Sequence, residues 1–238
     1  MLPSWRRGSM RSPFYDLHLR VIWKSRIGPR DTLNKSPHVM GAVVRATSPC
    51  FTPGTLIATD RGQQTVETLR RGDLLVTRDN GLKRIMWVGR RGFHYKEVLK
   101  EPGLCPIWIK AGAFGDGHPK RDMIVSPEHR FLVGPKTANL AIGEPEALVS
   151  ARTLIDGSSV RPASMLGVTY LHVLLNAHEV ILANGAWTES FHPDDAMIKS
   201  VAKNQRREIL SVFPEIATMG AARRFPAARP IIKSKFDS

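Results

Sequence analysis

The 238-residue sequence predicts an all-β domain followed by a C-terminal helix. Two observations carry this prediction. From residue 50 onward apolar and polar residues tend to alternate with a period of two, and Gly with Asp or Asn recurs between the alternating runs. Short strands separated by such turns are typical of β barrels and sandwiches. An apolar pattern of helical spacing begins only after Pro193.

The expected strands follow one another closely along the chain. In order they are residues 55–59, 74–77, 83–89, 106–110, 123–125, 131–133, 147–151, 168–175 and 179–183. Asp79-Asn80-Gly81 predicts a tight turn before the third of these strands. Residues 176–178 are expected to join the last two strands as a hairpin, and Asn184-Gly185 closes the series.

The segment after the strands changes character. Asp194 is a suitable N-cap for a helix with a partial apolar face that ends at Pro214. Residues 215–238, with scattered Arg and two Pro, are expected to form a loose basic tail, and residues 1–47 a basic N-terminal extension.

The formal charge of +14 first suggests a nucleic-acid partner. The excess is concentrated at the two ends, since residues 1–50 hold nine Lys or Arg against two Asp or Glu, and residues 191–238 hold nine against five. A basic tail is more often solvated than a binding site, so we do not expect a nucleic-acid partner. That alternative would give strongly salt-dependent affinity that survives Cys50→Ala.

Composition restricts the remaining classes. No run of about 18 apolar residues exists, so no membrane span is expected, and no secretory signal peptide is recognisable. Localisation therefore stays open between the cytoplasm and secretion by another route. Cys50 and Cys105 are too few for a disulfide framework and have no zinc-ligand spacing near them, so neither metal nor cofactor is expected. Cys105 is interpreted as a packing residue.

Three features stand apart from strand and turn sequence: Cys50, the segment Ser126-Pro127-Glu128-His129, and the segment 170–190 with His172 and His178. A nucleophilic thiol needs a group that moves its proton and donors that hold the developing oxyanion. Cys and His that are distant in sequence can meet in a closed β domain. From these residues alone the alternative stays open that Cys50 is a small buried apolar residue and that the histidines lie on the surface or in a hairpin.

Four blocks in order carry a family resemblance: Cys50-Phe51-Thr52-Pro53-Gly54-Thr55, residues 66–73, Ser126-Pro127-Glu128-His129, and His178 with Ala183-Asn184-Gly185. Together they resemble a Hint domain, the self-processing module of hedgehog proteins and inteins. More narrowly, they are similar to a bacterial Hint-like group that begins with this Cys block and ends near Asn-Gly-Ala-Trp-Thr-Glu-Ser. The resemblance covers residues 48–192 and implies a Hint-type β fold.

The resemblance implies a single-turnover reaction of the chain on itself. Cys50 would attack the Pro49 carbonyl in an N-to-S acyl shift, and water or a small nucleophile would cleave the thioester. The substrate would be the chain's own N-terminal segment. His129 would protonate the departing Cys50 amine, and Ser126, in place of the family's Thr, would hydrogen-bond near the scissile peptide. His178 would support the site. His172 has no motif position that can be assigned, and the alternative that it is a strand residue facing a neighbour stays open.

The second half departs from inteins, which end in His-Asn. Glu189 and Ser190 occupy those places, so Asn cyclisation cannot occur there and full splicing is not expected. Pro49 could either distort the scissile bond or hinder attack on it, because its ring restricts the backbone. The alternative function is a catalytically inactive Hint-fold module attached to a larger or secreted system.

Overall fold

The computed structural model describes residues 48–134 and 145–232. The expected extension at residues 1–47 and the last six residues of the expected tail lie outside them. The described chain is mostly β. None of its helices is long and apolar enough to cross a membrane.

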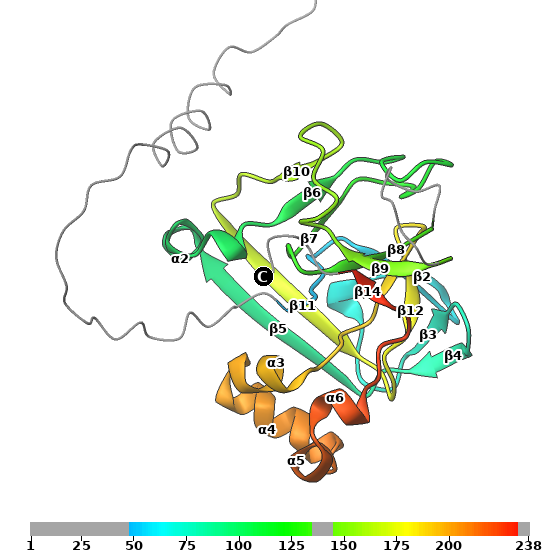
Figure 1. Ribbon diagram of the computed structural model, residues 1–238, viewed down its shortest axis with the longest axis vertical. Helices are drawn as coiled ribbons and strands as arrows, with labels where there is room; N and C mark the ends of the chain where they lie inside the picture. The colour runs from blue at the N-terminus through cyan, green and yellow to red at the C-terminus, as the bar shows by residue number, and fades with distance from the viewer. Residues whose placement is uncertain (1–47, 135–144, 233–238) are drawn as a thin grey trace, which may run out of the picture. The chain divides into compact units, whose positions relative to one another are not determined.

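The strands of the domain form three sheets (Figure 1). The largest sheet has the order β14-β9-β8-β13-β12-β1-β3-β4, with β2 paired to β1. A second sheet has the order β10-β6-β7, and the third contains only β11 and β5. The strands of the largest sheet are β1 (Leu56–Thr59), β2 (Gly62–Thr65), β3 (Leu74–Thr77), β4 (Gly81–Arg84), β8 (Arg130–Val133), β9 (Ala147–Ser150), β12 (Val180–Ala183), β13 (Ala186–Glu189) and β14 (Ile231–Ile232). The others are β5 (Trp87–His94), β6 (Ile107–Ile109), β7 (Met123–Val125), β10 (Val160–Pro162) and β11 (Gly167–Leu174).

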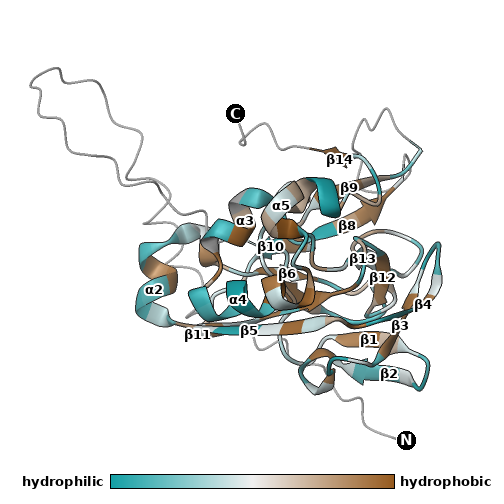
Figure 2. Ribbon diagram, turned by 90° about the horizontal axis from the view of Figure 1, so that it is seen from below, coloured by the Kyte–Doolittle hydropathy of each residue, from teal (hydrophilic) through white to brown (hydrophobic). Residues whose placement is uncertain are grey.

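Helices are few and short. Two 3-10 turns, η1 (Val66–Thr68) and η2 (Pro102–Leu104), and the helix α2 (Tyr95–Lys100) interrupt the strands. Four helices follow them: α3 (Asp195–Ser200), α4 (Lys203–Val212), α5 (Ile216–Met219) and α6 (Ala221–Arg224). Helix α4 lies beside β5 (Figure 2).

Two of the three apolar clusters among the described residues join the elements of the domain, and the third, smaller one contains Cys50 and Tyr170. The larger cluster fills the space among the sheets and contains fully buried side chains such as Ile57, Leu75 and Phe131. In the second cluster, Trp87 and Phe191 pack against Ile209 and other apolar side chains of the C-terminal helices. The helices are therefore attached to the β domain by apolar burial, which is the main stabilising contribution in folding.

The expected hairpin at residues 176–178 is wrong. β11 pairs along its whole length with β5, from Gly167 opposite His94 to Leu174 opposite Trp87. β12 pairs instead with β13, which the sequence analysis missed. The two-residue turn Asn184-Gly185 joins β12 and β13, and both residues have positive φ, 46° and 78°. Asn-Gly is the preferred sequence for this turn geometry, so β12 has its partner next to it in the chain.

Two further expectations need correction. The expected strand 83–89 is divided between β4 and β5, because the Ile85 N–H donates to Asp73 O, next to β3, whereas the Met86 N–H donates to Leu174 O of β11. The expected single helix is also divided, since α3 ends before α4 begins at Lys203. Its N-cap is confirmed: Asp194 accepts the Met197 N–H at 2.7 Å.

The segment 215–232 is not a loose tail. It forms α5, α6 and β14, and β14 adds in parallel to β9. Phe225 at its centre is fully buried in the second apolar cluster. Scattered apolar residues at irregular spacing gave no helical or strand period, which explains why the sequence analysis did not find this structure.

Candidate active site

Cys50 is fixed in the interior by its neighbour. Phe51 forms bridges to Val125 of β7 and to Leu171 of β11, so the chain enters the domain between two sheets at this point. The Phe51 N–H donates to Leu171 O and the Leu171 N–H donates to Phe51 O, each at 2.9 Å. Cys50 is consequently buried, with 3% of its surface exposed.

Ser126 holds both sides of the Pro49-Cys50 segment. Its Oγ accepts the Cys50 N–H at 2.9 Å and donates to Ser48 O at 2.8 Å. Its own N–H donates to Cys50 O at 3.0 Å. The nitrogen of the expected scissile bond is therefore bound to the hydroxyl that follows β7.

His172 lies at the thiol, although the sequence analysis gave it no role. Its Nδ1 is 3.2 Å from Cys50 Sγ, and its Nε2 is 3.6 Å from the same sulfur. Nδ1 also lies 3.3 Å from Pro49 O, the carbonyl oxygen of the expected scissile bond. The ring is fixed by stacking on Trp87 and by an edge contact with Phe191. A neutral imidazole at this place can accept the thiol proton or donate to the carbonyl oxygen, depending on its tautomer.

His129 lies on the other side of the Cys50-Phe51 segment, with its ring centroid 4.4 Å from that of Phe51. Thr188 Oγ1 donates to Arg130 O, so His129 Nε2–H donates to Thr188 Oγ1, at 2.5 Å. The tautomer leaves a lone pair on Nδ1, which is buried and has no hydrogen-bond partner among the described residues. His129 thus holds one unpaired basic nitrogen in the interior.

Burial determines the charge state of these groups. It raises the pKa of the Cys50 thiol to about 12, although hydrogen bonds with Ser48 and Ser126 oppose the shift. It lowers the pKa of His129 and that of His172 to about 4 each. At neutral pH the thiol is therefore protonated and both imidazoles are neutral. The thiol proton also has an acceptor in Ser48 O, 2.9 Å from Sγ.

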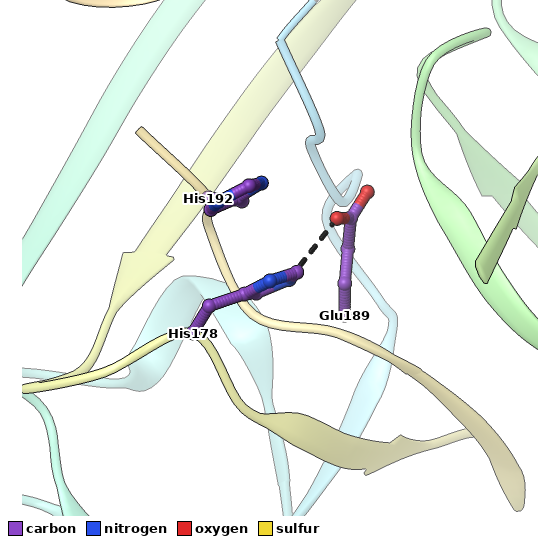
Figure 3. Close-up of side chains that lie close together, drawn as sticks. All are labelled: His178, Glu189 and His192. Carbon is purple, nitrogen blue, oxygen red and sulfur yellow. Dashed lines mark ion pairs between the residues drawn. The ribbon is translucent and has the colours of Figure 1, made fainter. Parts of the chain in front are cut away.

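His178 belongs to a second cluster with Glu189 and His192 (Figure 3). His178 Nε2 is 3.2 Å from Glu189 Oε2, and the rings of His178 and His192 stack with centroids 4.0 Å apart. Arg130 holds the same carboxylate, through its backbone N–H at 2.8 Å and its guanidinium at 3.0 Å. Burial opposes ionisation, but Arg130 and His178 lower the pKa of Glu189. No hydrogen bond or ion pair joins His178 to Cys50 within residues 48–134 and 145–232.

The three residues of this cluster bring possible ligand atoms within 4.8 Å of one another. Their arrangement does not fit a metal ion. The two imidazole rings are nearly parallel, at 5°, so their lone pairs run side by side and do not converge. Both carboxylate oxygens are already bound to Arg130. The geometry is that of a buried ion-pair network.

Of the four residues expected to act, the structure therefore places Cys50 and Ser126 in direct contact, His129 beside the residue that follows Cys50, and His178 in the Glu189 cluster. His172 was missed. The one available signal was strand periodicity, because Tyr170 and His172 share a face of β11 and both line the cavity at Cys50.

The fold and site define an all-β domain with a buried thiol between two sheets. Residues 49–195 match the sequence model of the Hint domain, which covers more than half of the chain. The chain belongs to the Hint domain family. Membership supports a capacity for self-processing in general.

Solved structures similar to this chain are inteins and intein-like domains. The gp41-1 intein has 15% identity and a TM-score of 0.35, over 58% of this chain and 96% of its own. The bacterial intein-like domain from Clostridium thermocellum has 12% identity and a TM-score of 0.37, over 60% and 98%. The zinc-bound Msm DnaB1 intein splicing domain has 18% identity and a TM-score of 0.36, over 58% and 98%. No curated protein matches the chain.

Proposed function

We propose that this chain cleaves its own Pro49-Cys50 bond through a thioester, without full splicing, and that residues 48–192 are the self-processing domain. The observation that carries the proposal is the convergence on one peptide bond. Ser126 Oγ binds its nitrogen, and His172 Nδ1 lies close to both its carbonyl oxygen and Cys50 Sγ.

In the first step Cys50 Sγ bonds to the Pro49 carbonyl carbon. The thiol proton passes to a base, for which neutral His172 is the nearest group at 3.2 Å. An unprotonated base beside the sulfur matters because a thiol whose pKa is about 12 forms little thiolate near neutral pH. His172 is therefore added to the residues that carry the reaction.

In the second step the bond between the Pro49 carbonyl carbon and the Cys50 nitrogen breaks, and that nitrogen takes up a proton. An amide nitrogen leaves only when it is protonated, and an imidazole is suited to supply that proton. His129 keeps this role: Nδ1 carries a lone pair in the neutral ring, so it takes up a proton from solvent and passes it to the Cys50 nitrogen, while His172 returns the thiol proton to solvent. Ser126 orients the departing nitrogen by the hydrogen bond that it already makes.

The C-terminal end of the proposed self-processing domain supplies no second cleavage. Glu189 and Ser190 stand where a splicing domain has His and the cyclising Asn, and the Glu189 carboxylate is bound to Arg130 and His178. His178 is thereby a positioning residue for the Glu189 cluster in this proposal. The products would be an acyl fragment ending at Pro49 and a fragment beginning at Cys50.

The test is the intact mass of the purified chain during incubation with hydroxylamine, a small nucleophile that cleaves thioesters. Wild-type protein and Cys105→Ser should yield a fragment that begins at Cys50. Cys50→Ala should yield none, and His129→Gln should slow the reaction. A folded wild-type chain that stays whole under this treatment would overturn the proposal.

The alternative is an inactive Hint-fold module. The burial of Cys50 and its raised pKa favour this second candidate, because both reduce the reactivity of the thiol. The same experiment decides between the two, since the inactive module predicts identical masses for wild type and Cys50→Ala apart from the substitution.

A further inference from the structure

A small cavity adjoins the thiol of Cys50. Its volume is about 20 Å³, and Cys50, Tyr170 and His172 form its inner wall. Arg91 lies at its rim and contributes a positive charge that lowers the pKa of the thiol, against the larger effect of burial. Any molecule that reacts with an acyl group on Cys50 Sγ from this side has to occupy this space.

The outer wall comes from the C-terminal helical segment. Gln205 of α4 and Val201, which precedes α4, both line the cavity. Val201 and Gln205 therefore close the cavity on the side of the C-terminal helices. Since α4 lies beside β5, the strand that carries Arg91, the wall spans two parts of the chain that are more than 100 residues apart in sequence.

The helix that carries this wall is held at several points. Gln205 Nε2 donates to Arg90 O at 3.1 Å, and 7% of the residue is exposed. One turn further, Glu208 accepts the Trp87 indole N–H at 2.8 Å, and Ile209 is fully buried. Gln205 does not leave the cavity wall by a simple change of rotamer, because its amide would lose a buried hydrogen bond.

We propose that Val201 and Gln205 exclude acyl acceptors of several heavy atoms, so that water is the acceptor when no small reagent such as hydroxylamine is added, and that Gln205 is the specificity-determining residue. The proposal rests on the function proposed above. A water molecule needs about 10–15 Å³ of such a cavity, so the space at Cys50 holds one water and excludes a thiol or amine of several heavy atoms.

The resolving step then balances as a hydrolysis. The oxygen of water bonds to the Pro49 carbonyl carbon, and the bond from that carbon to Cys50 Sγ breaks. One proton of the water passes through neutral His172 to the departing sulfur. The products are a carboxylic acid at Pro49, which ionises in solution, and the Cys50 thiol.

Size exclusion at Cys50 can be measured without any cleavage. All variants carry Cys105→Ser, so that Cys50 is the single thiol, and modification by N-ethylmaleimide is followed by intact mass. Gln205→Ala and Val201→Ala should each react faster than the parent, for Gln205→Ala by about tenfold, as expected for removal of a steric wall from a fitted pocket. Gln63→Ala, at an exposed position of β2, is the matched control and should react at the parent rate. Equal rates in folded Gln205→Ala, Val201→Ala and parent would overturn the proposal.

The acceptor is identified by competition. In ¹⁸O-enriched water containing glutathione, the wild-type fragment ending at Pro49 should carry one ¹⁸O atom and little glutathione, whereas Gln205→Ala should give a larger share of glutathione thioester. A wild-type product that is mainly glutathione thioester would overturn the water proposal and leave self-cleavage standing. No cleavage of wild type with hydroxylamine would instead refute the proposed function, and the maleimide rates would still decide whether the wall exists.

Discussion

Lowering the pH from 7 to 5 should destabilise the folded domain through two buried histidines. Burial lowers the pKa of His129 and that of His172 to about 4, whereas a histidine in an unfolded chain has a pKa of about 6.5. Between these values the unfolded chain binds more protons than the folded chain. Stability therefore rises with pH over this range and is lost as the pH falls through 6.5 toward 4.

The size of the effect follows from these two values. At pH 5 nearly every unfolded chain is protonated at each histidine, and about nine in ten folded chains are not. The difference between pH 7 and pH 5 amounts to about 2 kcal/mol for each histidine and about 4 kcal/mol for both. The pKa of His192, also lowered mainly by burial, adds in the same direction. The lowered pKa of Glu189 also makes the folded domain less stable as the pH falls. This loss occurs only below about pH 5, where a carboxyl group in the unfolded chain takes up its proton.

The assay is urea denaturation at pH 7, 6 and 5 followed by tryptophan fluorescence. Each variant is compared with itself across pH, so that any loss of packing cancels. The cleavage-deficient Cys50→Ala background keeps the chain whole. His172→Gln should lower the pH 7 to pH 5 difference by about 2 kcal/mol, and adding His129→Gln by about the same amount again. A free energy of unfolding that is equal at pH 7 and pH 5, or a His172→Gln variant with the full difference, would refute the assignment of neutral buried imidazoles.

Three other predictions concern single residues. His172→Gln should slow hydroxylamine-induced cleavage by about 10²–10⁴-fold, as expected for loss of a general base, and a wild-type rate in mass spectrometry would contradict its role. Ser126→Ala should cost about 1–3 kcal/mol in urea denaturation, because the buried Cys50 N–H loses its acceptor, and Ser126→Thr should recover most of it. Glu189→Gln should cost about 3–5 kcal/mol in the same assay, since Arg130 would lose its buried counter-ion; an unchanged midpoint would count against the ion-pair network.

The parts of the fold that the sequence predicts are those set by local chemistry. The period of two in residues 74–77 and 123–125 places β3 and β7 at the predicted residues, because alternate side chains enter the core. The turn predicted at Asp79-Asn80-Gly81 is likewise local: it joins β3 and β4, and Gly81 has a φ of 65°. Ser126 accepts the Cys50 N–H, and the catalytic roles that the Hint resemblance implies for Cys50 and Ser126 stay predictions.

The parts that sequence reasoning missed depend on contacts between distant segments. His172 reaches Cys50 across 122 positions in the chain, and only the pairing of β11 with β5 and the bridge from Leu171 to Phe51 bring them together. Strand periodicity indicates which side chains share a face, but it does not indicate what that face meets. For the same reason the packing of the C-terminal helices against Trp87 was not predictable from their short, interrupted apolar pattern.

Glu189 also acts electrostatically on Cys50 and His129. Glu189 raises the pKa of Cys50, an effect that adds to the larger one of burial, and it raises the pKa of His129 against the larger lowering effect of burial. A carboxylate in the place of a splicing residue therefore disfavours the thiolate while it makes His129 a better proton carrier. This combination favours a mechanism in which proton transfer accompanies attack over one that starts from a free thiolate. Such a mechanism needs a base next to the sulfur, which is the role proposed for His172, whereas a preformed thiolate would need none.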